Sequence, residues 1–435
     1  MSKIIEIGIF GLFCFSVLAF GSNEIWAMGV ICAVALTLLA AHLLAELPSL
    51  RIGSECIQVY LFLAVFLAIA SVQACILRAG FQSSDMWIPH TVERHTTLLY
   101  LALAASYSGI VLIIQTGFRS RFAIKLLITA IMAAGMFEAV YGIIQYLGGY
   151  DRIWAFKKKA YVGLATGTLI NRNHYALLLN IVICLGVGFV FYRLQRLLGG
   201  RKLSLKRLIY SPGSAKLGWL VALIALMGIG VVFSMSRMGI VAMLCSLGVM
   251  IVAAKTAGTG SHGAKFGILI LAAIIILALY IGIDPILARY ENLNLERESN
   301  QDRVALWRDA WKMLGHHRIF GQGLGTFEWT YPAYETMEPD VPARFAHNDY
   351  LQILIETGAA GLGALIIGFI LIGRIAIRNL RCQADPLVSG IGLGTLGALT
   401  AIGLQEITDF GLYIPAVAVA ASLIAGLNLR VRSPG

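Results

Sequence analysis

Charged side chains are scarce in this sequence, since Asp, Glu, Lys and Arg make up only 13% of its 435 residues. A soluble domain usually carries about 25%. Hydrophobic residues reach 58%, and the mean hydropathy is +0.80. This composition excludes a water-soluble enzyme and a disordered chain, and the continuous apolar runs lack the alternation of a membrane β-barrel. We therefore expect an all-α polytopic membrane protein.

Several kinds of ligand set are also missing from the sequence. The 7 cysteines are odd in number and lie mostly in apolar runs, so neither a structural disulfide nor a thiolate metal site is expected. The loops expected outside the membrane hold no Asp-x-Asp pair that could bind the metal of a nucleotide sugar. A soluble basic face with interleaved aromatic residues, as nucleic acids require, is absent too. We expect no metal, no cofactor and no nucleic-acid partner.

Twelve apolar stretches come close to the roughly 20 residues that cross a bilayer. The first lacks a small-residue cleavage site, so we interpret it as a retained helix rather than a signal peptide. The sequence predicts one integral membrane domain over residues 1–435, with a long external loop, 284–346, between the ninth and tenth spans. The predicted spans are 4–20, 25–44, 56–76, 97–115, 122–147, 174–192, 217–233, 238–254, 266–283, 349–373, 387–405 and 413–429.

Lysine and arginine predict the orientation, because short basic loops stay in the cytoplasm. The net charge is +11, and with a cytoplasmic N-terminus the basic residues gather in the even-numbered connections and the C-terminal tail. Both termini are therefore expected inside. The segment 148–172 breaks the pattern, because it is expected outside yet carries Arg152, Lys157, Lys158, Lys159 and Arg172. An anionic ligand at the outer face would explain these charges, and contact with lipid headgroups is the simpler alternative.

The long external loop contains one helical pattern. Residues 303–314 place Leu306, Trp307, Ala310, Trp311 and Leu314 at helical spacing, which predicts an amphipathic helix able to lie on the membrane surface. The run Gly321-Gln-Gly-Leu-Gly325 ends it. This run is not a dinucleotide-binding fingerprint, because no βαβ unit surrounds it.

Four polar clusters are expected at the same outer face: 167–174, 234–237, 302–308 and 347–350. Their arginines carry forked donors that match phosphate oxygens, and His347 has the side chain whose ordinary pKa suits a proton acceptor at neutral pH. Taken singly, each has a plainer explanation, such as an arginine reaching to headgroups or a polar helix start. We take His347 as the catalytic candidate and Arg237, Arg303 and Arg172 as the diphosphate-binding candidates. Possible accessory residues are Asn171, Asn173, Ser236, Tyr141, Gln145, Lys158 and Asn348.

These motifs, in this order, resemble the O-antigen ligase and O-antigen polymerase superfamily of bacterial membrane glycosyltransferases. The resemblance covers residues 130–375, whereas the outer spans agree only in hydropathy and number. The matching motifs are Tyr141-Gly-Ile-Ile-Gln145, Gly167-Thr-Leu-Ile-Asn-Arg-Asn-His-Tyr-Ala176, Ser234-Met-Ser-Arg-Met-Gly239, Arg303-Val-Ala-Leu-Trp307 with Gly321-Gln-Gly-Leu-Gly-Thr-Phe327, and His347-Asn-Asp-Tyr-Leu-Gln352 with Glu356-Thr-Gly358.

The resemblance implies a GT-C-type helical bundle with a long periplasmic loop, in the bacterial inner membrane. It implies metal-independent transfer of a glycan from undecaprenyl diphosphate to an acceptor hydroxyl at the periplasmic face, and direct displacement would invert the anomeric carbon. It assigns Arg237 and Arg303 to the diphosphate, and Arg172 matches the family's basic residue before the sixth span. It makes His347 the base or the group that positions the acceptor.

The acceptor stays open at this point. A ligase would use lipid A–core, a polymerase a second lipid-linked repeat, and a protein-directed relative a hydroxyl side chain. We favour the first two, because no added domain that could hold a protein is evident in the sequence. A transporter or flippase would also fit twelve spans, although transporter sites tend to lie at the bilayer midplane and in paired repeats.

Overall fold

The structure is a computed structural model. It describes residues 2–49, 52–77, 88–198, 213–257, 272, 293–315, 317–336, 343–382 and 384–431. Within these residues, nine helices are long and apolar enough to cross a membrane. They are α2 (Ile25–Glu46), α3 (Ser54–Cys75), α4 (Arg94–Gly117), α5 (Arg121–Leu147), α6 (Arg172–Leu198), α8 (Ser214–Phe233), α9 (Arg237–Thr256), α14 (Asp349–Leu380) and α15 (Pro386–Gln405).

Two shorter helices complete the bundle: α1 (Ser2–Leu18) and α16 (Pro415–Arg430). The all-α polytopic architecture is thus confirmed, and helices occupy eleven of the twelve stretches predicted to span. The remaining one, 266–283, lies almost wholly outside the described residues, so the count of twelve stays a prediction. The short connections include η1 (Phe20–Ser22), η2 (Leu47–Ser49) and η4 (Gly411–Tyr413).

The helix α6 forms the centre of the bundle. Its apolar stretch is completely buried, and α5, α8, α9, α15 and α16 all pack against it. Glycines permit the closest of these approaches: a side chain at Gly188 would collide with the backbone of Gly390 and Gly394 on α15. Small residues of this kind let transmembrane helices pack tightly where no hydrophobic driving force exists between them.

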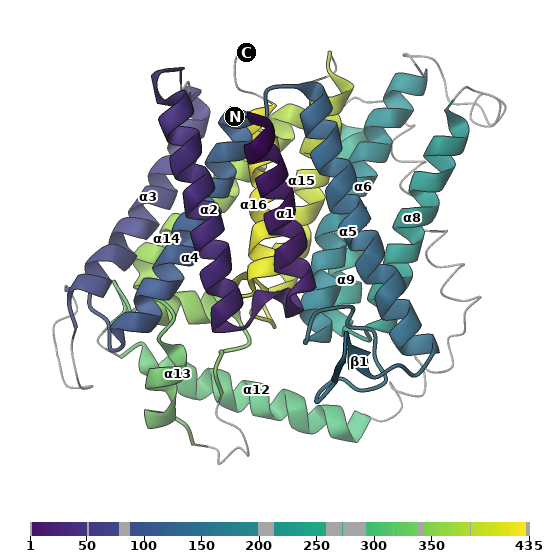
Figure 1. Cartoon of the computed structure of the whole chain (residues 1–435). Coiled ribbons are helices and arrows are strands. Elements are labelled where there is room, and N and C mark those ends of the chain that lie inside the picture. Colours follow the sequence, from purple (N-terminus) through teal and green to yellow (C-terminus); the bar gives the residue numbers. More distant parts are fainter. Residues whose placement is uncertain are drawn as a thin grey trace.

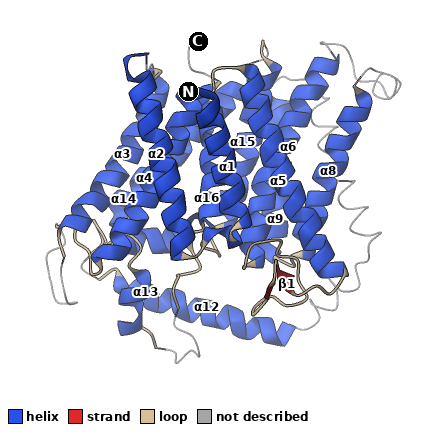
Figure 2. Ribbon diagram, in the orientation of Figure 1, coloured by secondary structure: helices blue, strands red, loops and turns tan. Residues whose placement is uncertain are grey.

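One end of the bundle carries the structured extramembrane elements (Figure 1). There α12 (Leu293–Met313) lies across the helix ends, roughly perpendicular to the bundle, and α13 (Phe327–Thr330) and η3 (Tyr331–Ala333) follow it. A small hairpin of β1 (Arg152–Ile153) and β2 (Phe156–Lys157), which the sequence did not predict, occupies the same end (Figure 2). The helix α12 contains all but the last residue of the predicted amphipathic segment, 303–314. The start of α1 and the end of α16 lie together at the opposite end (Figure 1).

The helix α14 is broken at Gly358, whose φ of 68° and ψ of −174° are not helical. Backbone groups released by a break inside a membrane bundle must find partners within the protein. Residues 318–323 of the long loop supply them. The amides of Ala359 and Ala360 donate to the carbonyls of Arg318 and Ile319, and the amides of Gln322 and Gly323 donate to the carbonyls of Ile355 and Glu356. The break thus anchors the long loop to the bundle.

Candidate functional site

The polar clusters predicted to share one face meet at the end of the bundle that carries α12. The loop before α6 is held to the end of α8 by a hydrogen bond from the Ala165 amide to the Phe233 carbonyl. The indole of Trp307 on α12 donates to the Ala346 carbonyl at 2.8 Å. This bond holds α12 against the segment that carries His347, so Trp307 has a structural contact besides any contact with lipid.

His347 and Arg303 come together through that contact. Arg303 precedes Trp307 by one helical turn, on the same side of α12. His347 has a left-handed backbone with φ of 50°, and its Nδ1 atom is buried without a hydrogen-bond partner among the described residues. Burial lowers the pKa of His347 to about 4, and the charge of Arg303 acts in the same direction. Its imidazole is therefore neutral at neutral pH and only weakly basic.

A second histidine, His174, lies beside the first. Its Nε2 atom is 3.4 Å from the Asp409 carboxylate, and both side chains are almost fully buried. The ring of Phe410 contacts both imidazoles edge to face, with centroids 4.6 Å from His174 and 4.8 Å from His347. Burial alone would raise the pKa of Asp409, but its interactions with His174 and then His347 lower that pKa below its ordinary value. Asp409 therefore carries its negative charge between two imidazoles.

Arginine 172 joins this cluster through an aromatic side chain. Its guanidinium lies over the Tyr161 ring, 5.7 Å from the centroid. Burial raises the pKa of Tyr161, and Arg172, Asp409 and Arg303 all act electrostatically on the phenol. Arg172 and Arg303 therefore both act on the Tyr161 phenol, and Arg303 acts on His347, at the same end of the bundle.

Arg237 begins α9 at the same end. The first turns of α9 and α6 pack so closely that a side chain at Gly239 would collide with Ala176, and the Asn180 amide donates to the Gly239 carbonyl at 2.8 Å. Arg237 thus lies at the same end of the bundle as the first turns of α6. Its side chain is half-buried.

Three predicted accessory residues hold the loop 148–171 in place. Gln145 is buried, and its amide donates to the carbonyls of Arg152 and Gly167 while its oxygen accepts from Thr166. The Nζ atom of Lys158 is buried and donates to the Leu164 carbonyl at 2.7 Å. The Tyr141 hydroxyl accepts from the Trp154 amide at 2.9 Å. These contacts give all three residues a structural role in the loop.

The other accessory residues lie at helix starts. Ser236 caps α9 by accepting from the Gly239 amide, and Asn348 caps α14 by accepting from the Leu351 amide. Asn171 accepts from the Asn173 amide, and the Asn173 carbonyl accepts from Gln405. Asn348 is therefore the N-cap of α14, while Asn171 also faces a cavity.

That cavity, which we call the outer cavity, has a volume of about 230 Å³. It lies between η1, the start of α6 and the segments 344–345 and 410–414. Its lining residues are Phe20, Asn23, Tyr161, Leu169, Ile170, Asn171, His174, Arg344, Phe345, Phe410 and Ile414.

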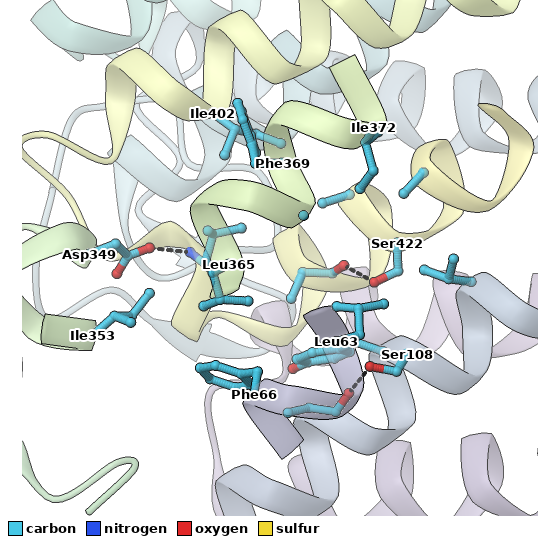
Figure 3. Close-up of a pocket in the computed structure, with 18 of the residues that line it drawn as sticks. Leu63, Phe66, Ser108, Asp349, Ile353, Leu365, Phe369, Ile372, Ile402 and Ser422 are labelled. Carbon is cyan, nitrogen blue, oxygen red and sulfur yellow. Dashed lines mark hydrogen bonds between the residues drawn. The ribbon is translucent and has the colours of Figure 1, made fainter. Parts of the chain in front are cut away.

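A larger cavity, the intramembrane cavity, has a volume of about 510 Å³ and lies among α3, α4, α14, α15 and α16. Its walls are almost entirely apolar. Figure 3 shows Asp349 at one edge, near Ile353 and away from Ile372 and Ser422. Asp349 accepts from the Leu412 amide at 3.0 Å, and Glu406 accepts from the Gly411 amide at 2.7 Å. The two carboxyls thereby order the loop that carries Asp409.

The site residues predicted from the sequence do not include His174, Tyr161, Asp409 or Glu406. Asp409 had a usable signal, because it is an ionisable residue in a short connection between two apolar spans at the predicted outer face. His174 stood inside a quoted motif, but its pairing with Asp409 joins residues 235 positions apart, which no local pattern reveals. Among the described residues, no group of three or more His, Cys, Asp or Glu forms a metal site.

A comparison with protein families matches residues 222–366 to the O-antigen ligase family. The matched segment runs from α8 into α14 and includes Arg237, Arg303 and His347. The match confirms the resemblance to the O-antigen ligase and polymerase superfamily and supports glycosyltransferase activity of that general type. A comparison with curated proteins found no match.

Proposed function

We propose that this protein transfers a glycan from undecaprenyl diphosphate to an acceptor hydroxyl at the periplasmic face of the bacterial inner membrane, without a metal. The observation that carries the proposal is the meeting of Arg303, Arg172 and His347 at the end of the bundle covered by α12. With the end that carries α12 facing the periplasm, residues 284–346 lie in the periplasm, and both termini lie in the cytoplasm.

The arginines would hold the diphosphate. Forked guanidinium groups bind phosphate oxygens in pairs, and a cationic site stabilises the charge that develops on a leaving diphosphate. Arg303 and Arg172 act from α12 and the start of α6, and Arg237 acts from the neighbouring start of α9. Three separate helices thus present positive charge to one anionic group.

The intramembrane cavity would take part of the polyprenyl chain. Its apolar walls suit a hydrocarbon, and Asp349 at its edge stands two residues from His347 (Figure 3). A chain that leaves the cavity at Asp349 would end near His347. His347, whose buried Nδ1 atom has no hydrogen-bond partner among the described residues, would position the acceptor hydroxyl.

Lipid A–core is the acceptor that we favour, which makes the protein a ligase. A polymerase that uses a second lipid-linked repeat is the alternative, and so is a flippase that moves the lipid-linked glycan without transferring it. The glycosyltransferase family match favours transfer over flipping.

The test is transfer by the purified protein in lipid vesicles that contain the lipid-linked glycan and one acceptor at a time, with products separated on a gel. We expect wild-type protein to extend lipid A–core, and the variant His347→Gln to lose at least about 100-fold in rate, because catalytic hydrogen-bonding groups contribute on that scale. The control is His95→Gln, an exposed histidine at the start of α4.

The outcomes separate the alternatives. Extension of the lipid-linked repeat instead of lipid A–core would make the protein a polymerase. Movement of the donor across the bilayer with no transfer product would overturn the proposal in favour of a flippase. Wild-type activity of His347→Gln would remove His347 from the mechanism.

A further inference from the structure

The outer cavity has the chemistry of a sugar subsite. Ligand sites for drug-sized molecules usually occupy about 300–1,000 Å³, so a cavity of about 230 Å³ suits a single sugar ring. Aromatic rings of Phe345 and Phe410 stack in its wall, with centroids 4.2 Å apart and planes within 8°. The side-chain amides of Asn23 and Asn171 offer both donors and acceptors to hydroxyl groups.

The cavity is not built for an anion. Its cationic lining residue, Arg344, is already paired with Glu328 at 2.8 Å. The arginines assigned to the diphosphate are not among its lining residues in the described part of the chain. A neutral, hydroxyl-bearing group therefore fits it better than a phosphate.

His174 is the proton acceptor that this cavity presents. It lines the cavity, whereas His347 is not among the described lining residues. Its Nε2 atom faces the Asp409 carboxylate at 3.4 Å, which leaves the other ring nitrogen for a ligand. A buried carboxylate this close to an imidazole stabilises the imidazolium that forms when the ring takes a proton. Phe410 fixes the ring from the side.

The cavity also adjoins the diphosphate site. Tyr161 lines it and lies under the Arg172 guanidinium, with Arg303 close enough to act on the phenol. A sugar in the cavity would therefore stand next to a donor whose diphosphate is held by these arginines.

We propose that the outer cavity binds the terminal sugar of the acceptor, and that His174, with the Asp409 carboxylate 3.4 Å from its Nε2 atom, removes the proton from its attacking hydroxyl. The hydroxyl oxygen then bonds to the anomeric carbon of the donor sugar. The bond from that carbon to the diphosphate oxygen breaks, and its electron pair leaves with undecaprenyl diphosphate. His174 is the catalytic residue of this step and Asp409 a positioning residue. This inference rests on the proposed function.

The test is steady-state transfer by the full-length protein in vesicles, with undecaprenyl-diphosphate-linked glycan as donor and lipid A–core or the lipid-linked repeat as acceptor. A general base contributes about 10²–10⁴-fold, so His174→Gln should lower kcat at least 100-fold with the KM of the donor unchanged. Added imidazole should partly restore His174→Ala, which a merely structural histidine would not permit. Asp409→Asn should lower kcat more than it raises the KM of the acceptor, and Asp409→Glu should recover part of the rate.

The variant Asn23→Ala tests the subsite. Loss of one neutral hydrogen bond should raise the KM of the acceptor about threefold to tenfold and leave the KM of the donor unchanged. Size-exclusion chromatography checks that each variant is folded, and His174→Asn replaces His174→Gln if the latter aggregates.

The outcomes distinguish this inference from the function on which it rests. A folded His174 variant with wild-type kcat overturns the inference, and so does a loss that imidazole does not restore. The proposed function still stands after either of these His174 results if His347→Gln is inactive in the same series of variants. If wild-type protein transfers glycan to neither acceptor, both proposals are overturned.

Discussion

Replacing Arg303 by Gln should lower the rate of glycan transfer about 10²–10³-fold, the usual effect of removing one preorganised donor from a developing negative charge. Arg303 lies on α12 one turn before Trp307, whose hydrogen bond to Ala346 fixes that helix beside His347. The guanidinium would meet the diphosphate as its charge increases in the transition state. Because Arg303 would stabilise the leaving diphosphate, the loss in rate should appear with every acceptor.

The variant Arg303→Lys separates charge from shape. Lysine keeps the positive charge but presents a point charge instead of a fork, so it cannot form two parallel bonds to a phosphate. We expect an intermediate loss of at least about tenfold, since hydrogen bonds to charged groups contribute about 1.5–3 kcal/mol. The matched control is Arg308→Lys, an exposed arginine on the same helix, which should keep the wild-type rate.

The measurement is the initial rate of product formation in vesicles at saturating acceptor, with the donor concentration varied. A normal rate for Arg303→Gln would show that Arg303 does not contact the diphosphate. Equal losses for Arg303→Lys and Arg308→Lys would point to a general effect of the basic surface on membrane association.

Hydropathy and charge were sufficient to predict most of the fold. Each of the eleven described bundle helices overlaps a predicted span, because a helix that crosses hydrocarbon must satisfy its own backbone and must be apolar along about 20 residues. The amphipathic pattern of residues 303–314 likewise predicted the helix that crosses the end of the bundle. Local patterns of this kind survive in the sequence because they act over one helix.

The site was predictable only in part, because a local pattern acts over one helix, whereas contacts in the site join segments that are distant in the sequence. The grouping of Arg172, Arg303 and His347 followed from their common membrane face. By contrast, Gln145 and Lys158 look like ligand-binding residues in the sequence, and only the path of the loop 148–171 shows that their polar groups bind backbone. His174 and Asp409 act as a pair across two distant segments, and a hydropathy pattern carries no information about such pairing.

The break in α14 was hidden as well. A run of apolar residues predicts an uninterrupted span at 349–373, and Gly358 is one of several glycines there. What distinguishes it is the backbone of residues 318–323, which enters the break from the long loop. The first turns of α14, which follow His347, take their direction from this junction, so the geometry of the site depends on it.

Substituting Gly358 should therefore prevent the protein from folding correctly. The conformation with φ of 68° and ψ of −174° belongs to a region that is essentially restricted to glycine, and forcing another residue into it costs about 1–3 kcal/mol. A Cβ atom at Gly358 would also lie 2.1 Å from the Ile319 carbonyl oxygen. The backbone of Ile319 cannot move aside without breaking the hydrogen bonds that tie residues 318–323 to α14. We expect Gly358→Ala to yield little or no monodisperse protein in detergent.

The control is Gly363→Ala on the same helix, because a Cβ atom there meets nothing within 4 Å. Alanine favours a helix over glycine by about 1 kcal/mol, so this variant should be at least as stable as wild type. Fluorescence-detected size-exclusion chromatography after heating at increasing temperatures measures both. A Gly358→Ala protein as stable as Gly363→Ala would mean that α14 runs straight through this position. In that event the contacts between the long loop and α14 could not place His347 as described. The role proposed for His347 beside Arg303 would then be overturned.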